Sequence, residues 1–101
     1  MKPVLYIVIP CYNEEKVLPI TSGMFLEKLK SLISADIISD DSRIMFVNDG
    51  SRDSTWDIIT KLSGEQKYFT GLSLSRNRGH QNALLAGLTE AGKLCDITIS
   101  I

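Results

Sequence analysis

The sequence has few cysteines, no excess of positive charge and no long apolar run, and each absence excludes a class of protein. Its two cysteines, Cys11 and Cys95, are too few and too far apart for a disulfide framework or a zinc site, and they fit a reducing compartment. The formal net charge of -1 predicts no broad basic surface for nucleic acid. The longest fully apolar run covers residues 4–9, whereas a membrane-spanning helix needs about 20 residues. We therefore expect a soluble, cytoplasmic chain without a nucleic-acid partner.

Apolar residues make up 44% of the 101 residues, which suits one small domain with its own core. Four segments have the apolar, β-branched content of strands: 4–9, 43–47, 70–75 and 97–101. Three segments with apolar residues at helical spacing alternate with them: 19–35, 53–64 and 82–92. This alternation with short connections predicts an α/β fold, a Rossmann-like parallel sheet with helices on both faces.

Several residues are expected to mark the ends and the buried faces of these elements. Pro10 is expected to end the first strand, because proline has no N–H to donate to a ladder. Gly64 is expected to stop the second helix. The helical spacing places Met24, Phe25 and Trp56 on buried faces.

Ligands of such sheets bind in the crevice beyond the carboxyl ends of the strands, and three polar clusters lie there. The first cluster follows the first strand and contains Pro10, Tyr12, Asn13 and Glu14. Tyr12 fits the flat face of a ring, while Asn13 and Glu14 fit hydroxyls or ring nitrogens. The alternative is a turn whose polar residues only cap the next helix, and this cluster alone favours that alternative.

The second cluster follows the second strand and includes Asp49, Gly50 and Ser51. A carboxylate here repels a diphosphate but accepts the ring N–H of uracil or guanine, or a ribose hydroxyl. We therefore expect Asp49 at the base or ribose end of a nucleotide. Gly50 permits a tight turn, and Ser51 can satisfy free N–H groups of the next helix. For Asp53 and Thr55 we expect helix capping.

The third cluster follows the third strand and contains Arg76, Asn77, Gly79, His80 and Gln81. Cationic side chains beside a glycine and a helix N-terminus supply the donors that hold phosphates. The alternative is a solvated basic loop in which His80 is a surface or capping residue. In chain order the clusters supply carboxylates, then amides, then cations, and a nucleoside diphosphate has that polarity.

Other sites are excluded because their motifs are missing. The glycine pattern of a dinucleotide fold is absent after the first strand, and neither a phosphate-loop Gly-Lys-Ser nor a Gly-x-Ser-x-Gly elbow is present. Cys11 has no evident base beside it, so we expect an ordinary semi-buried thiol and no nucleophile.

Together the segments IVIPCYNEE, VNDGSRDST and SRNRGHQNALLAGL resemble the family 2 inverting glycosyltransferases of the GT-A fold. The resemblance extends over nearly the whole chain and points to the polyprenyl-phosphate sugar transferases, such as dolichol-phosphate mannosyltransferase and the bactoprenol glucosyltransferases. It implies that Pro10, Tyr12 and Glu14 line a nucleoside pocket and that Asp49 contacts the base. It also implies that residues 76–81 lie near the diphosphate and the sugar.

Two positions depart from the family pattern, and one expected motif is missing. Asn48 stands where many relatives have a second aspartate, and Arg78 where an aromatic residue is common; both departures bear on fine specificity. The resemblance implies Mg²⁺ or Mn²⁺ held by an Asp-x-Asp motif after the fourth strand, but the sequence ends at CDITISI, before that motif. Asp96 is no substitute, because it lies at the opposite end of that strand. We therefore expect residues 1–101 to be the nucleotide-binding half of a GT-A domain, with the metal ligands, acceptor site and general base beyond residue 101.

The resemblance implies transfer of a hexose from a UDP- or GDP-sugar, with inversion, to a lipid acceptor such as a polyprenyl phosphate or to a saccharide. The intact protein is expected at the cytoplasmic face of a membrane, with membrane association through its C-terminal region, while the fragment only binds nucleotide. A rival enzyme class, the sugar-phosphate nucleotidyltransferases, would show a glycine-rich loop after the first strand. The alternative from a different class is a non-catalytic nucleotide-binding or assembly module.

Overall fold

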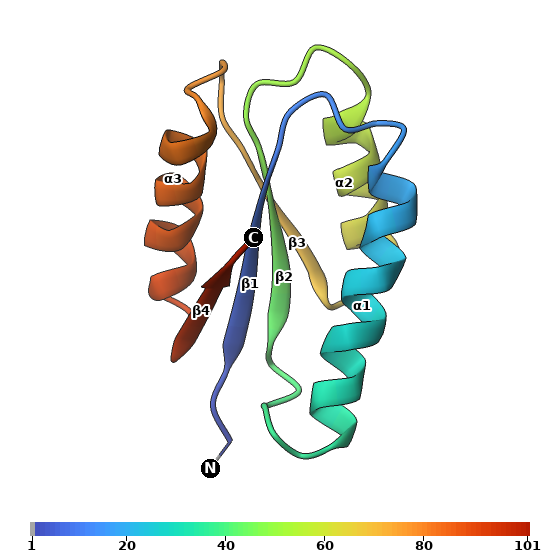
Figure 1. The fold of residues 1–101 in the computed structure, drawn as a ribbon, viewed down its shortest axis with the longest axis vertical. Helices are drawn as coiled ribbons and strands as arrows, with labels where there is room; N and C mark the ends of the chain where they lie inside the picture. Colours follow the sequence, from blue (N-terminus) through green and yellow to red (C-terminus); the bar gives the residue numbers. More distant parts are fainter. Residues whose placement is uncertain (1) are drawn as a thin grey trace.

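The computed structural model describes residues 2–101 and confirms the predicted α/β architecture (Figure 1). Its elements follow one another in the order β1 (Leu5–Cys11), α1 (Leu18–Ser34), β2 (Arg43–Asn48), α2 (Thr55–Glu65), β3 (Phe69–Ser73), α3 (His80–Gly92) and β4 (Ile97–Ser100). The strands form one parallel sheet in the order β3-β2-β1-β4. The chain therefore builds the sheet outward to β3 and then returns to the far side of β1. None of the helices in the described part of the chain has the length and apolar content needed to cross a membrane.

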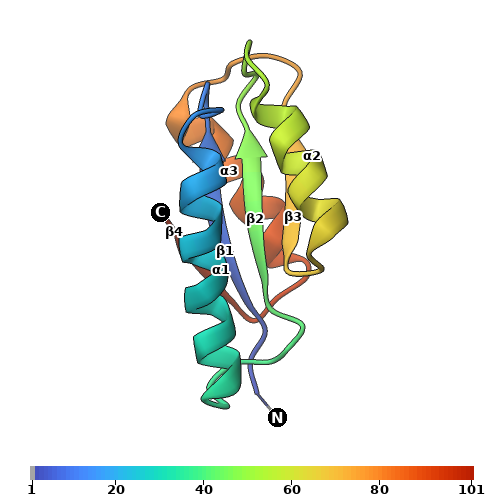
Figure 2. The same ribbon diagram turned by 90° about the vertical axis from the view of Figure 1, so that its right-hand side faces the viewer.

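Helices cover both faces of the sheet, with α1 and α2 on one face and α3 on the other (Figures 1 and 2). The side chains of β1 alternate between the two faces. Leu5, Ile7 and Ile9 join the core on the side of α1 and α2, whereas Tyr6 and Val8 join the core on the side of α3. This explains the uninterrupted apolar run in the sequence, because a strand covered on both faces has no polar side.

Helix α3 packs closely on the sheet because its inward face consists of small residues, Ala83, Gly87 and Ala91, which are all buried. A Cβ atom on Gly87 would lie 2.5 Å from Val8 Cγ1 and 2.6 Å from Val47 Cγ2. Glycine at this position thus allows the helix to approach the centre of the sheet, where β1 and β2 lie side by side.

Pro10 does not end the first strand, contrary to the prediction from the sequence. It lies inside β1, opposite Val47. The carbonyls of Val4 and Val8 accept hydrogen bonds from the β4 side, and that of Cys11 accepts one from the β2 side. By this alternation the Pro10 nitrogen faces the β4 side, where the pairing of the described residues extends no further than Val8. Among the described residues, the missing N–H of proline therefore costs no ladder hydrogen bond.

Three further residues differ from their predictions, while Phe25 packs against the core as expected. Gly64 does not stop α2 but lies within its last turn. Met24 lies on the outward face of α1 and is 65% exposed. Trp56 is 36% exposed, and its ring edge lies against Gly71 at the rim of the core. Helical spacing located the helices correctly, but it did not separate their inner faces from the rims.

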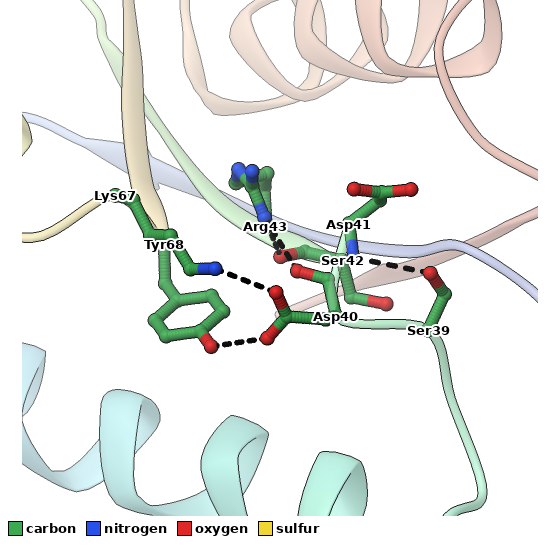
Figure 3. A network of polar contacts seen from close by, with 7 residues as sticks. All are labelled: Ser39, Asp40, Asp41, Ser42, Arg43, Lys67 and Tyr68. Carbon is green, nitrogen blue, oxygen red and sulfur yellow. Dashed lines mark hydrogen bonds and ion pairs between the residues drawn. The ribbon is translucent and has the colours of Figure 1, made fainter.

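At the amino edge of the sheet a polar cluster joins the turn before β2 to the start of β3 (Figure 3). The Asp40 carboxylate accepts hydrogen bonds from Lys67 Nζ and from the Tyr68 hydroxyl. The guanidinium carbon of Arg43 lies 5.6 Å from the centroid of the Tyr68 ring. We call these four residues the amino-edge cluster, and they lie at the end of the sheet opposite the three polar clusters found in the sequence.

Candidate functional site

The three loops that follow β1, β2 and β3 meet at the carboxyl edge of the sheet, at the upper end of Figure 1. We call them loop 1 (12–17), loop 2 (49–54) and loop 3 (74–79). A cavity of about 260 Å³ lies between them, lined by Pro10, Cys11, Tyr12, Glu14, Asp49, Asn77 and His80. We call this cavity the edge pocket. It lies beyond β1, where the strand order reverses toward β4, and open α/β sheets bind ligands at such a point.

Loop 1 is fixed against loop 2 and the start of α2 by five hydrogen bonds, each between a side chain and a backbone N–H. Asn13 adopts a left-handed conformation with a φ of 51°, which asparagine tolerates better than most residues. Its Oδ1 atom accepts the Arg52 N–H at 2.9 Å. This turn leaves Tyr12 exposed and Glu14 half-buried at the wall of the edge pocket.

Loop 3 is held against loop 2 by Asp49 and Gly50. Gly50 has a φ of +64°, and a Cβ atom there would lie 2.3 Å from the carbonyl carbon of Arg76 and from the nitrogen of Asn77. Only glycine permits so close an approach with this backbone conformation. The Asp49 Oδ1 atom accepts the N–H of Arg78 at 2.7 Å. Loop 2 thus contacts both other loops and holds the edge pocket together.

The adjacent polar residues Asn48 and Asp49 differ in what they contact. Asn48 is buried, its Nδ2 donates to Ser73 Oγ at 3.0 Å, and its Oδ1 accepts the Ser51 N–H at 3.2 Å. Asp49 is only 3% exposed, yet it lines the edge pocket in addition to holding loop 3. Of the two residues, only Asp49 lines the edge pocket.

Half of the twelve residues predicted to bind nucleotide line the edge pocket. These are Pro10, Tyr12, Glu14, Asp49, Asn77 and His80. The other half lie in the same loops or in the first turn of α3, outside the lining: Asn13, Gly50, Ser51, Arg76, Gly79 and Gln81. Asn13, Gly50 and Ser51 shape the loops through the contacts described here. Contact between any of the twelve and a nucleotide stays a prediction.

Loop 3 carries two positive charges beside the edge pocket, while loops 1 and 2 carry one each, on Lys16 and Arg52. Arg76 and Arg78 are exposed, and neither forms an ion pair with another of residues 2–101. Gly79, with a φ of 91°, leads into the N-terminus of α3, and its N–H donates to Asn77 Oδ1 at 3.0 Å. Two cations and a helix N-terminus therefore adjoin the pocket, and both features favour a bound anion.

Cys11 lines the edge pocket but was not predicted among its residues. Burial, and after it the negative charge of Glu14, raise the pKa of the Cys11 thiol to about 12. The thiol therefore stays protonated at neutral pH, which agrees with the prediction that Cys11 is not a nucleophile. The signal in the sequence that could have identified it is its place at the carboxyl end of β1.

The described residues do not form a metal centre. Among residues 2–101 no cluster of three or more histidine, cysteine, aspartate or glutamate side chains is arranged to hold a metal ion. Asp96 lies at the amino end of β4, where its Oδ2 atom accepts the Val4 N–H at 2.8 Å, at the sheet edge opposite the edge pocket. The Mg²⁺ or Mn²⁺ site predicted beyond residue 101 stays a prediction.

Comparison with known sequences identifies relatives over nearly the whole chain. The family model described as "Glycosyl transferase family 2" matches residues 6–94. The uncharacterized glycosyltransferase YkoT of Bacillus subtilis (strain 168) is 50% identical over 100 residues, which cover 99% of this chain and 30% of that protein. A prophage bactoprenol glucosyl transferase homolog of Escherichia coli (strain K12) is 36% identical over 84% of this chain and 26% of that protein. An undecaprenyl-phosphate 4-deoxy-4-formamido-L-arabinose transferase of Shewanella sediminis (strain HAW-EB3) is 37% identical over 80% of this chain and 23% of that protein.

Two solved structures share the fold of the chain. The mannosyltransferase PcManGT from Pyrobaculum calidifontis, in complex with GDP-Man and Mn²⁺, superposes with a TM-score of 0.61 at 22% identity, over 89% of this chain and 25% of that one. Residues 1–349 of TarS from S. aureus superpose with a TM-score of 0.59 at 23% identity, over 99% of this chain and 27% of that one. At these identities the likeness shows the fold alone.

The chain spans less than a third of the length of the curated relatives it matches. The family match nevertheless covers most of the chain, and the matched range contains all three loops of the edge pocket. The chain therefore belongs to glycosyl transferase family 2.

Proposed function

We propose that the full-length protein transfers a hexose from a UDP- or GDP-sugar to a polyprenyl phosphate, with inversion at the anomeric carbon. Membership of glycosyl transferase family 2 supports the glycosyl transfer. The acceptor is suggested by two relatives that are named for transfer to bactoprenol and to undecaprenyl phosphate. The donor class is supported by the edge pocket itself.

The observation that carries the proposal is the division of charge around the edge pocket. Asp49 and Glu14 place carboxylates in its lining, whereas Arg76 and Arg78 lie on loop 3 beside the N-terminus of α3. A nucleoside end accepts carboxylates, since its ring N–H groups and ribose hydroxyls donate hydrogen bonds. A diphosphate end needs cations and free N–H groups. We therefore propose that the nucleoside occupies the edge pocket and that the diphosphate lies toward loop 3.

In this arrangement Tyr12 stacks on the base, and Asp49 and Glu14 accept its N–H groups or the ribose hydroxyls. The cations of loop 3 stabilise the negative charge that gathers on the leaving diphosphate. A phosphate acceptor is already a nucleophile at neutral pH, so its attack needs little help from a base. An oxygen of the acceptor phosphate attacks the anomeric carbon directly. This attack breaks the bond between the anomeric carbon and the donor phosphate oxygen, and it inverts the configuration at that carbon.

We propose further that residues 1–101 form the nucleotide-binding half of a larger catalytic domain, which binds nucleotide but does not catalyse transfer alone. The length of the relatives supports this division. The proposed Mg²⁺ or Mn²⁺ would neutralise diphosphate charge when bound, and we place its ligands outside these residues. With a lipid-linked acceptor, we propose that the reaction takes place at the cytoplasmic face of a membrane.

The sharpest test of the pocket is the variant Asp49→Asn in the full-length protein. The amide oxygen of asparagine can still accept the Arg78 N–H, so loop 3 keeps its anchor while the negative charge toward the ligand is lost. We expect the affinity for the matching nucleotide, UDP or GDP, to fall about tenfold or more, because hydrogen bonds to charged groups contribute about 1.5–3 kcal/mol. Isothermal titration with and without Mn²⁺ measures this affinity.

Asp41→Asn is the matched control, because Asp41 is an exposed carboxylate at the opposite edge of the sheet and should leave the affinity unchanged. Equal affinity in the wild type and Asp49→Asn would remove Asp49 from the ligand contacts. An assay for transfer of labelled hexose to a short polyprenyl phosphate then distinguishes a glycosyltransferase from a non-catalytic nucleotide-binding module. A full-length protein that binds nucleotide but transfers nothing would favour the non-catalytic binding module.

A further inference from the structure

Three consecutive backbone N–H groups of loop 1 are all held by side chains from the segment 51–55. The N–H of Asn13 donates to Ser51 Oγ at 3.0 Å. That of Glu14 donates to Thr55 Oγ1 at 2.8 Å. That of Glu15 donates to an Asp53 carboxylate oxygen at 3.2 Å. These acceptors are Ser51, Asp53 and Thr55, which alternate along the chain.

The same contact is made in the opposite direction by loop 1 side chains. Asn13 Oδ1 accepts the Arg52 N–H at 2.9 Å, and Glu15 Oε2 accepts the Ser54 N–H at 3.3 Å. Beyond the end of β1, the turn that forms the pocket wall is therefore joined to loop 2 by side chains. The nearest backbone-to-backbone bond between the two segments runs from the Asp49 N–H to the Cys11 carbonyl oxygen.

Helix capping, the role predicted for Asp53 and Thr55, does not account for these contacts. Ser54 is the N-cap residue of α2 and makes no side-chain capping bond. Asp53 Oδ1 accepts the first helical N–H, that of Thr55, at 2.9 Å, but its other oxygen is turned to loop 1. The Thr55 hydroxyl caps nothing; it donates to Asp53 and accepts from Glu14.

Thr55 lies at the centre of this contact. It is fully buried, with 0% of its surface exposed, so water cannot replace its hydroxyl if the hydroxyl is removed. Partial burial raises the pKa of Asp53, but the hydrogen bonds from Thr55 and from the Glu15 N–H outweigh this and hold that pKa below its usual range. The carboxylate that orients the Thr55 hydroxyl is thus charged at neutral pH.

We propose that Thr55 and Asp53 are positioning residues for nucleotide binding, which fix the backbone of Asn13–Glu15 and so hold Tyr12 and Glu14 at the pocket wall before a ligand arrives. The proposal rests on the proposed nucleotide site. Neither Thr55 nor Asp53 lines the edge pocket, so their effect on a ligand is indirect. A wall that is fixed in advance loses less conformational freedom on binding, and that saving appears as affinity.

The test compares Thr55→Val with Thr55→Ser in the full-length protein. Valine keeps the volume but removes the hydroxyl, whereas serine keeps the hydroxyl. We expect Thr55→Val to bind its nucleotide, UDP or GDP, about tenfold more weakly, with Thr55→Ser close to the wild type. In the ligand-free protein, hydrogen exchange of a peptide spanning residues 12–17 should be faster in Thr55→Val alone, as followed by mass spectrometry.

Ser42→Ala provides a matched control at the other edge of the sheet. Ser42 is also fully buried, and its Oγ accepts the backbone N–H of Leu5, the first residue of β1, at 2.9 Å. It should lower the thermal unfolding midpoint to a similar extent as Thr55→Val while leaving nucleotide affinity and exchange at residues 12–17 unchanged. The two variants together separate a loss of positioning from a loss of stability.

Each outcome decides between the positioning role and the proposed function. A wild type that binds nucleotide and a Thr55→Val variant that binds equally well would overturn the positioning role and leave the proposed function intact. The same holds if Ser42→Ala weakens binding as much as Thr55→Val does. A wild type that binds neither UDP nor GDP would overturn the proposed function, and the positioning role with it. If Thr55→Val does not fold, Asp53→Asn takes its place with the same readouts.

Discussion

At the carboxyl edge of the sheet, side chains of loop 2 and the start of α2 hold the backbone of loop 1, whereas in the amino-edge cluster side chains bind mainly one another. The amino-edge cluster is made of exposed or half-buried groups, with Asp40 between the Lys67 ammonium and the Tyr68 hydroxyl (Figure 3). The loops of the carboxyl edge are instead held by Thr55, which is fully buried, and Asp49, which is nearly so. Ser42 makes one buried contact of this kind at the amino edge, but it holds the first residue of β1 and not a loop. The carboxyl-edge loops and the amino-edge cluster are therefore unequal in how firmly they fix backbone.

The difference follows from how much freedom each kind of contact removes. A hydrogen bond from a backbone N–H to a buried side chain fixes the backbone at that residue, and leaving the N–H unpaired costs about 1–3 kcal/mol. An exposed ion pair typically contributes about 0–1 kcal/mol and leaves both long side chains mobile. A pocket that selects a ligand needs fixed loops. The buried contacts at the carboxyl edge join loops to one another, whereas the buried contact of Ser42 at the amino edge holds the start of a strand.

The largest effect is expected from Gly50→Ala, which breaks the carboxyl edge. A methyl group there would lie 2.3 Å from the backbone of loop 3, and the φ of +64° is unfavourable for alanine. Because the neighbouring atoms are backbone, loop 3 must move. We expect a loss of stability of at least about 1–3 kcal/mol from the backbone conformation alone, together with a loss of nucleotide binding. Chemical denaturation and isothermal titration measure the two effects.

Gly64→Ala is the control for this substitution. Gly64 lies in the last turn of α2, and a Cβ atom there meets nothing within 4 Å. Alanine at that helical position should therefore raise stability by about 0.5–1 kcal/mol and leave binding unchanged. Equal effects of the two substitutions would contradict the claim that loop 3 is held by its close approach to Gly50.

A smaller effect is expected from Asp40→Asn, which breaks the amino-edge cluster. Hydrogen bonds from Lys67 and then from Tyr68 lower the pKa of Asp40 below its ordinary value of 3.8. Its charge therefore adds stability above pH 3.8, and this contribution is lost as the pH falls from that value through the lower pKa of the folded state. The Asp40→Asn variant should lack this part of the stability loss at acidic pH. Thermal unfolding midpoints measured across that pH range, at low and high salt, provide the test.

Nucleotide affinity is the readout that links Asp40→Asn to the comparison between the edges. The cluster lies at the opposite end of the sheet, so affinity at neutral pH should stay the same as in the wild type. A drop in affinity comparable to that of Thr55→Val would mean that the two edges are coupled. The contacts at the amino edge would then also affect the edge pocket, against the view that each edge fixes only its own backbone.

The alternation of apolar runs was enough to predict the sheet, its helices and the meeting of the three loops, because parallel strands bring their carboxyl ends to one edge. The ends of strands and helices were less predictable where they depend on packing against, or pairing with, another element. Pro10 breaks a local rule for strands, and its nitrogen faces the β4 side, where the pairing of the described residues does not reach it. Gly64 likewise lies inside α2, since the turns before it are stabilised by packing of Ile59 on the sheet.

The site was predictable to the extent that it depends on position along a strand. Asp49, Glu14 and Tyr12 follow strands directly, and they line the edge pocket. The roles of Asp53 and Thr55 were not predictable, because a capping residue and a residue that holds another loop have the same side chains before the same helix. Only the fold shows that loop 1 lies beside them.

The smallest effect separates the two cysteines, which lie at opposite edges of the sheet. Cys11 is buried at the edge pocket, where its thiol pKa is raised to about 12. Cys95, just before β4, is half-buried, and its pKa is raised mainly by partial burial. We therefore expect iodoacetamide to label Cys95 well before Cys11 in the native protein, and both at similar rates in denaturant. Mass spectrometry of the two peptides follows the labelling.

Added nucleotide sharpens this last comparison, because Cys11 lines the edge pocket and Cys95 does not. Saturating UDP or GDP should slow the labelling of Cys11 further and leave that of Cys95 unchanged. Labelling of Cys11 as fast as Cys95 without ligand would mean that the floor of the pocket opens readily, against the fixed geometry of the carboxyl edge. Equal protection of both cysteines by nucleotide would indicate a global gain in stability, since a ligand confined to the edge pocket shields only one of them directly.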